Sequence, residues 1–184
     1  MSVSNFPIIS NKEEFDAFNK GNIKDIWTEI IIQAPPTVVR SVLLDVKNRA
    51  SWDPSVTHME VIKGDIKDLS SKPELKLGFD FKLDGNETKI PFHPRISRND
   101  EECLMWTLKV MGGNFYAMDH VHIFEPMDDG KATRFVNYER FYGFLKFVMD
   151  YSTWENCFKA SNEALKKIAE EKAKEWELRW THDS

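Results

Sequence analysis

The chain has 184 residues and a net charge of −5 at pH 7, and this length predicts a single domain with a substantial core, because about 150 residues already bury roughly two-thirds of the unfolded surface. The acidic balance argues against a surface that binds nucleic-acid phosphates or anionic lipids. No apolar run approaches the ~18 residues of a membrane-spanning helix, so stable membrane insertion is not expected.

The cysteine content and the N-terminus predict the compartment. Cys103 and Cys157 lie within apolar patterns, and two cysteines do not form the dense disulfide framework of a small secreted domain. The N-terminus lacks the order of charged, apolar and small residues that marks a secretion signal. These features predict a reduced, cytoplasmic protein.

The first segment of the chain predicts a helical arm over residues 1–24 that packs on a domain spanning residues 25–184. Phe15 and Phe18 share one side of the short helix, and Gly21 can end it.

The next segment predicts one strand followed by two short helices. Residues 25–34 alternate between apolar and polar side chains, which indicates a half-buried strand. Pro35 and Pro36 stop that strand and can open a helix that ends near Asp45. A shorter helical turn is expected over residues 48–52.

From Met59 onward the apolar period changes to two for about eighty residues, which predicts six strands joined by short turns. Residues 84–86 form one of these turns. A three-residue turn at positions 112–114 would place Trp106 and His120 on the same face of the sheet. The six expected strands span residues 59–63, 75–83, 88–96, 103–110, 116–125 and 133–141.

Residues 145–176 predict one long helix without an internal Gly or Pro. Large apolar residues at helical spacing form one face, which Ser161 and Asn162 interrupt. These two polar residues indicate either a kink or satisfied hydrogen bonds, which we favour, or a cavity beside the helix. The apolar residues of this face are Phe147, Tyr151, Trp154, Phe158, Leu165 and Ile168.

These elements predict an α+β fold in which a curved antiparallel sheet of about seven strands wraps around the long C-terminal helix. One face of such a sheet must be covered, and a single helix is too narrow to cover it. The two short helices would roof the remaining space. The topology therefore predicts a pocket of roughly 300–1,000 Å³, although the same large apolar side chains are numerous enough to fill it.

The stretch Ile30 to Pro54 reads IIIQAPPTVVRSVLLDVKNRASWDP and resembles the opening of the START-like (SRPBCC) polyketide-cyclase/dehydrase superfamily. Later segments resemble the second half of that family in order and spacing: residues 104–106, 120–126, 133–143 and 162–166. The resemblance covers roughly Asp25 to Glu171 and implies the helix-grip fold that the superfamily shares with pollen allergens. It implies function only broadly, because the superfamily includes lipid carriers, cyclases and chaperone activators.

A polar cluster is expected inside the fold. If Phe124 faces the interior, His120 and His122 do so too, because alternate residues of a strand share a face. Asn137 and Glu139 face them from the following strand. An imidazole beside a carboxylate in an apolar cavity can move a proton near neutral pH, as a cyclisation or dehydration requires. The same groups can instead join the strands or orient a ligand, which we favour because buried polar groups are nearly always hydrogen-bonded.

We therefore predict that the domain binds a hydrophobic small molecule, such as a lipid or polyketide, in an internal aromatic cavity. His120, His122 and Glu139 are the catalytic candidates if the protein is instead a cyclase or dehydratase, and a protein-interaction module of the chaperone-activator type is a third alternative. The predicted ligand-binding residues are Phe79, Phe81, Trp106, His120, His122, Phe124, Asn137, Glu139, Phe141, Tyr151, Trp154 and Phe158.

No cofactor or metal is predicted. The sequence contains no phosphate-binding glycine loop, serine-hydrolase elbow or zinc-protease motif. A zinc ion on His120 and His122 would need a third ligand, for which Glu139 is the only near candidate. The sequence leaves the oligomeric state open.

Overall fold

The computed structural model describes residues 9, 11–18, 24–80, 83 and 92–182. Within these ranges the element order confirms one strand, two short helices, six strands and a long helix. The strands are β1 (Lys24–Ile32), β2 (Val56–Lys63), β3 (Glu74–Phe79), β4 (Arg95–Asn99), β5 (Cys103–Val110), β6 (Tyr116–Met127) and β7 (Ala132–Tyr142). The α-helices are α1 (Lys12–Phe18), α2 (Pro36–Leu44), α3 (Arg49–Trp52) and α4 (Tyr151–His182).

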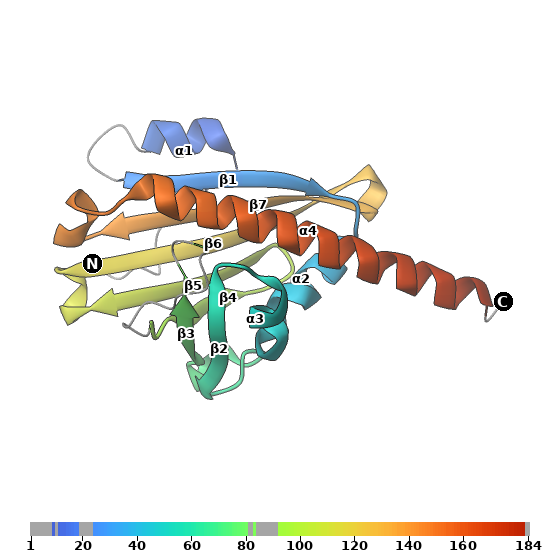
Figure 1. Cartoon of the computed structure of the whole chain (residues 1–184), viewed down its shortest axis with the longest axis horizontal. Coiled ribbons are helices and arrows are strands. Elements are labelled where there is room, and N and C mark those ends of the chain that lie inside the picture. Colours follow the sequence, from blue (N-terminus) through green and yellow to red (C-terminus); the bar gives the residue numbers. More distant parts are fainter. Residues whose placement is uncertain (1–8, 10, 19–23, 81–82, 84–91, 183–184) are drawn as a thin grey trace.

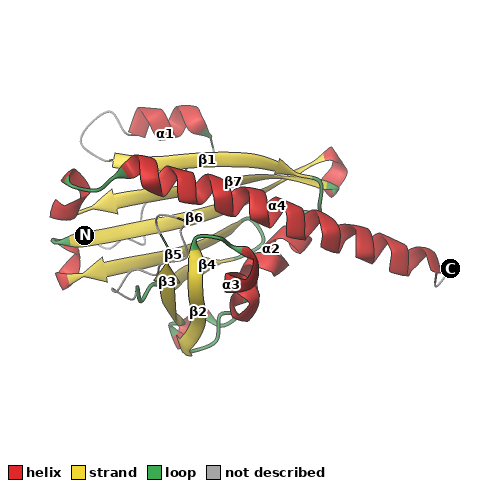
Figure 2. Cartoon of the chain, in the orientation of Figure 1, coloured by secondary structure: helices red, strands yellow, loops and turns green. Residues whose placement is uncertain are grey.

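The strands form one antiparallel sheet in the order β1-β7-β6-β5-β4-β3-β2. The first two strands thus occupy opposite edges, and α2 and α3 connect them. Figure 1 shows α4 crossing one face of the curved sheet, and Figure 2 shows the same arrangement coloured by secondary structure. Both α2 and α3 contact α4, so the three helices together cover the concave face. This arrangement is the predicted helix-grip fold.

The long helix begins later than predicted, at Tyr151 rather than Leu145. The Asp150 carboxylate accepts hydrogen bonds from the backbone N–H groups of Ser152 and Thr153 at 3.2 and 3.3 Å, and such a cap fixes the first turn. Residues Phe144–Phe147 form a separate 3-10 turn. No helix in the described ranges is both long enough and apolar enough to cross a bilayer.

The inner face of α4 buries Trp154, Cys157, Phe158 and Leu165 against the sheet. Fully burying a large apolar side chain contributes about 1.5–3 kcal/mol, so these contacts are the main attachment of the helix. Ser161 and Asn162 lie on the same face and are buried and hydrogen-bonded, which confirms the interpretation that we favoured.

The connection between β5 and β6 has five residues, 111–115, so the predicted three-residue turn is wrong. Val110 pairs with Tyr116, and residues Met111–Gly113 form a 3-10 turn that takes up the additional length. Both loop lengths are odd, so the predicted faces are preserved. Trp106 pairs directly with His120 and both side chains are buried.

The fourth strand is also displaced from its predicted position. It spans Arg95–Asn99 rather than residues 88–96. Phe92 exchanges backbone hydrogen bonds with Leu77 at 2.8 and 3.0 Å, and Pro94 accepts one from the Leu75 N–H at 2.8 Å. Because Pro94 has no N–H to return, it interrupts the pairing between Phe92 and the strand that begins at Arg95. The predicted turn at 84–86 lies outside the described residues, as do positions 88–91.

The outer face of the sheet carries a second apolar cluster beneath α1. Phe15 of α1 is buried, with its ring 4.9 Å from the Trp27 ring and 5.8 Å from the Tyr138 ring. Val121 and Val136 complete the contact area in the central strands. The central strands β6 and β7 are therefore buried on both faces, which positions their side chains firmly.

Replacing Phe15 by alanine is expected to lower the free energy of unfolding by about 3 kcal/mol, because Phe→Ala in a packed cluster leaves a cavity. Urea unfolding measures the change. Phe147→Ala is the matched control, since Phe147 is 62% exposed and its truncation should cost little. Equal effects of the two substitutions would show that α1 does not contribute to the core.

Candidate functional site

Four polar side chains lie side by side on the inner face of β6 and β7. His120 pairs with Glu139, and His122 pairs with Asn137. All four side chains are buried beneath α4. The predicted inward orientation and proximity of these residues are therefore confirmed, and the register between the strands sets their spacing.

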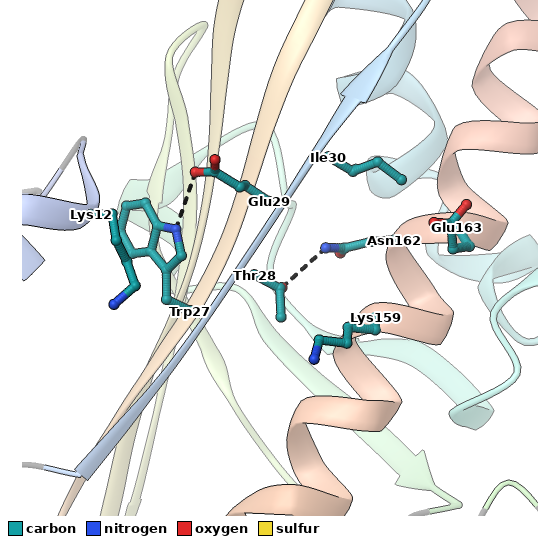
Figure 3. A pocket seen from close by; sticks show the side chains of 8 residues that line it. All are labelled: Lys12, Trp27, Thr28, Glu29, Ile30, Lys159, Asn162 and Glu163. Atoms are coloured by element: carbon teal, nitrogen blue, oxygen red, sulfur yellow. Dashed lines mark hydrogen bonds between the residues drawn. The ribbon is translucent and has the colours of Figure 1, made fainter.

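A directional chain of hydrogen bonds runs from the edge strand into this cluster. The Thr28 hydroxyl donates to the Asn137 carbonyl at 2.9 Å and accepts from the Asn162 side-chain amide at 3.0 Å; Figure 3 shows the latter contact. Asn137 Nδ2 donates to Asn162 Oδ1 at 2.9 Å. Asn137 Oδ1 is then the acceptor for His120 Nε2 at 2.7 Å.

This chain determines the tautomer of His120. Because Asn137 Oδ1 accepts, His120 Nε2 carries the proton and Nδ1 carries the lone pair in the neutral ring. His120 Nδ1 lies 4.0 Å from Glu139 Oε2. The lone pair of the imidazole thus faces the carboxyl group, at a separation longer than a hydrogen bond.

Burial keeps the cluster uncharged at neutral pH. Desolvation lowers the pKa of His120 to about 3, although its hydrogen bond to Asn137 opposes the shift. Desolvation and the nearby His120 hold the pKa of His122 well below its ordinary value. Desolvation also raises the pKa of Glu139 well above 4.5, and the charges of Asp119 and Asp25 act in the same direction. The contact between His120 and Glu139 is therefore a contact between neutral groups rather than an ion pair.

Several buried polar atoms in the cluster have no hydrogen-bond partner within the described ranges. They are both carboxyl oxygens of Glu139 and the indole nitrogen of Trp106. The Trp106 ring lies 4.7 Å from the His122 ring, and the His122 ring lies 4.5 Å from the His120 ring. Polar atoms without partners thus lie on inner-face residues of β5 and β7.

A second polar group, not predicted from the sequence, roofs the interior. Arg49 of α3 contacts Asp53 through Nη2 at 2.7 Å. Asp53 Oδ1 accepts from the Ser55 hydroxyl at 2.8 Å and from the Ser161 hydroxyl of α4 at 2.6 Å. The spacing of Arg49 and Asp53, four residues apart, is the signal in the sequence that could have revealed this pair.

Among the described residues, the space between the roof and the sheet is about 10 Å³; the pocket of roughly 300–1,000 Å³ that the topology suggests stays a prediction. The Phe158 ring stacks on His120 at 4.8 Å, and the edge of Trp106 lies 5.1 Å from His120. Large aromatic side chains thus fill most of the space beneath α3 among the described residues. A cavity this small holds at most about one water molecule.

The predicted ligand-binding residues divide into two groups. Five of them line the enclosed space, and six others pack in the surrounding core or polar cluster; Phe81 lies outside the described residues. Whether any of them contacts a ligand stays a prediction. The five are Phe79, Trp106, His120, Asn137 and Phe158; the six are His122, Phe124, Glu139, Phe141, Tyr151 and Trp154.

A wider hollow of about 330 Å³ opens between β1, α1 and α4 (Figure 3). Lys159 and Glu163 border it on α4, and Trp27 and Glu29 border it on β1. Asn162 and Thr28 form its inner wall, so the hydrogen-bond chain to His120 starts at this hollow. In the part of the chain that the structure describes, no group of three His, Cys, Asp or Glu residues is arranged to hold a metal ion.

The chain is similar to a known protein family and to several solved structures. A family model described as "Polyketide cyclase / dehydrase and lipid transport" matches residues 25–170. The chain resembles the structure of the Zhui aromatase/cyclase from Streptomyces sp. R1128, with a TM-score of 0.65 and 15% identity over 81% of this chain and 94% of that chain. No curated protein is significantly similar in sequence.

Two further structures extend the fold similarity. Ginseng major latex-like protein 151 from Panax ginseng has a TM-score of 0.65 and 9% identity, over 81% of this chain and 99% of that chain. A START superfamily protein from Mycobacterium smegmatis has a TM-score of 0.59 and 13% identity, over 84% of this chain and 99% of that chain. Identities this low establish a shared fold and no shared activity.

Glu139→Gln is expected to flatten the dependence of stability on pH. Folding raises the pKa of Glu139 above its ordinary value of 4.5, so the folded chain retains a proton that the unfolded chain releases, and the free energy of unfolding falls as the pH rises above that value. The loss is about 1.4 kcal/mol per pH unit until the folded pKa is reached. Glutamine is neutral in both the folded and the unfolded chain, so the substitution removes this pH-dependent loss. Urea unfolding of both proteins at about pH 5 and pH 8 measures the slopes.

Other buried groups titrate in both proteins, so their contributions to the pH dependence of the free energy of unfolding cancel when wild type and variant are compared. The pKa of Asp119 is raised to about 6, so the free energy of unfolding also falls with rising pH as this group titrates. The lowered pKa values of His120 and His122 reduce stability only as the pH falls below about 6.5. Identical slopes for wild type and variant would contradict a neutral Glu139.

Proposed function

Because the chain belongs to the polyketide cyclase/dehydrase and lipid transport family, which its family-model match establishes, we propose that it binds a hydrophobic small molecule between the sheet and α4. The polar cluster on β6 and β7 would orient an oxygen-bearing group of that ligand. Aromatic and aliphatic side chains of the inner face would contact the remainder.

The observation that carries this proposal is the set of unpartnered atoms on Trp106 and Glu139. A buried polar group without a hydrogen bond costs about 1–3 kcal/mol. A carbonyl or hydroxyl group of a ligand could accept from the Trp106 indole and exchange hydrogen bonds with the neutral imidazole or carboxyl group. Ligand binding would thereby remove a cost that the unliganded protein carries.

The electrostatics favour an uncharged polar group on the ligand. His120 and His122 are neutral because of their lowered pKa values, so no cation within the cluster would pair with a carboxylate. The nearest positive charge, on Arg49, is already paired with Asp53. A ketone, phenol or alcohol on an apolar skeleton, as in a polyketide or a neutral lipid, fits these groups better than a fatty-acid carboxylate does.

Binding requires the interior to open. The ligand would displace Phe158 from His120, or move the α3 roof away from Ser161, before it reached the polar cluster. If the open form is a minor population, the apparent affinity falls in proportion to that population. The packed interior therefore predicts slow or weak binding relative to a protein with a preformed cavity.

A cyclase or dehydratase is the second candidate, and one geometric feature favours it. Glu139 is held protonated beside the lone pair of His120 Nδ1, at 4.0 Å, so a ligand group placed between them could receive a proton from the carboxyl group. His120 itself is a weak base because its pKa is about 3, which limits proton abstraction near neutral pH. Binding without turnover is therefore the better-supported function.

A protein-interaction module of the chaperone-activator type is the third candidate. The small enclosed volume is the observation that favours it, because a filled interior leaves only the surface for recognition. Ligand titration separates it from the first two candidates.

Titration with uncharged, environment-sensitive dyes and with polyketide-like phenols should give saturable binding that chelators do not abolish. His120→Gln and His122→Gln should each change the affinity by about 1 kcal/mol, the size of one hydrogen bond, because glutamine keeps a donor and an acceptor.

Native mass spectrometry of the protein purified from its own cells should reveal the bound compound.

Phe144→Ser/Phe147→Ser is the control for surface binding, since both rings are exposed and lie away from the interior. Dye binding that disappears in this double variant would be surface binding and would count against the proposal. The absence of any saturable signal favours the interaction module. A turnover rate that falls about a hundredfold in either histidine variant at constant affinity would instead establish the enzyme.

A further inference from the structure

One end of the sheet displays a cluster of exposed apolar side chains on two neighbouring loops. Met111 is 78% exposed, Val148 69%, Phe144 64% and Phe147 62%. Soluble proteins rarely gather several such side chains in one place without a binding partner. The cluster, which we term the apolar tip, consists of Val110, Met111, Phe115, Phe144, Phe147 and Val148.

Backbone contacts join the two loops into one unit. The Phe144 N–H donates to the Asn114 carbonyl at 3.2 Å, and the Leu145 N–H donates to the Phe115 carbonyl at 3.1 Å. Gly143, at φ +82°, permits this approach, because a Cβ there would lie 2.7 Å from the Phe115 carbonyl oxygen. Figure 1 shows both loops at the same end of the molecule. The two loops are therefore held together by contacts within the chain, and the tip does not need a partner to form.

The outward orientation of these side chains is not a sign of a loose segment. Leu145, Met149 and Tyr151 of the same stretch pack against the main core, and the Tyr151 hydroxyl donates to the Lys146 carbonyl at 2.5 Å. The segment thus anchors itself with one set of apolar residues while Phe144, Phe147 and Val148 point to solvent.

Basic side chains lie beside the apolar tip, and the Asp150 carboxylate that follows Val148 accepts the hydrogen bonds of the first turn of α4. Lys146 Nζ lies 4.9 Å from the centre of the Phe147 ring. A hollow of about 580 Å³ beside the tip is lined by His93, Arg95 and Lys109 together with Val110 and Met111. Its only described carboxylate, Glu74, is engaged by Arg95 at 3.3 Å. Exposed apolar groups bordered by cations match the layer of phosphates and acyl chains at a bilayer surface.

We propose that the apolar tip docks the protein reversibly on phospholipid bilayers, with the basic hollow against headgroup phosphates. The overall charge of −5 does not oppose this, because at physiological ionic strength only charges within about 8 Å of the surface act strongly. The tip consists of six side chains on two loops, far fewer than the roughly 20–30 residues a side of a standard stable protein interface, so it suits shallow insertion between lipids better than a stable contact with a second copy. The proposal concerns the outer surface and holds whether or not the interior binds a ligand.

Sedimentation of the full chain with phosphatidylcholine vesicles, with and without about 30% phosphatidylserine, tests the docking. We expect binding to both, tighter with phosphatidylserine and weakened by salt. Phe144→Ser/Phe147→Ser should lower the partition coefficient at least roughly tenfold, since each phenylalanine loses apolar contact with lipid. Lys109→Gln should reduce the preference for phosphatidylserine about fivefold.

Val61→Ser/Ile62→Ser is the matched control, because these side chains are 36% and 44% exposed on β2 and lie outside the tip. It should bind vesicles as the wild type does, and circular dichroism should show that all variants are folded. Failure of the wild type to sediment with either vesicle would overturn the proposal, as would equal binding by the Phe144→Ser/Phe147→Ser variant. A dimer in analytical ultracentrifugation that this variant dissociates would assign the tip to a second copy instead.

Discussion

The side-chain amide of Asn162 fixes the position of α4 on the sheet. A helix that presents only apolar side chains can shift along a sheet at modest cost, whereas a buried amide is satisfied at one position only. Asn162 forms hydrogen bonds with Asn137 of β7 and with Thr28 of β1. These two bonds fix the position of the helix relative to both strands. Phe158, one turn earlier, is thereby placed on the His120 ring. The same amide also orders the donors and acceptors that give His120 its tautomer.

Periodicity in the sequence was sufficient to predict the fold, because each strand and helix buries one face and that burial repeats in the sequence. Errors occurred where a local contact overrode the pattern. The Asp150 cap starts α4 after Leu145, and Pro94, which has no N–H, interrupts the pairing between Phe92 and β4. The loop before Tyr116 is longer than predicted because a 3-10 turn is not distinguishable from a tight turn by composition alone.

The polar cluster was predictable for a different reason: parity alone determines which face of a strand a residue occupies, and the odd loop length preserved it. The roof formed by Arg49 and Asp53 was missed because its partners, Ser55 and Ser161, come from distant parts of the chain. The small space beneath α3 was not predicted either. Volume depends on how individual rings such as Phe158 pack, and apolar spacing carries no information on that. The apolar tip was equally hidden, because exposure in a loop depends on tertiary contacts.

The short helix α3 connects the interior to a tryptophan near the surface. A helix of four residues has almost no stability of its own, because nucleating a helical turn is unfavourable. Its order comes instead from the Asp53 carboxylate, which joins it to Ser161 on α4. Trp52 lies at the end of this turn, with the Arg49 guanidinium 4.5 Å from its ring. A molecule that competed for Ser161 would therefore change the surroundings of the Trp52 indole, so the proposed binding would be visible in the fluorescence of that side chain.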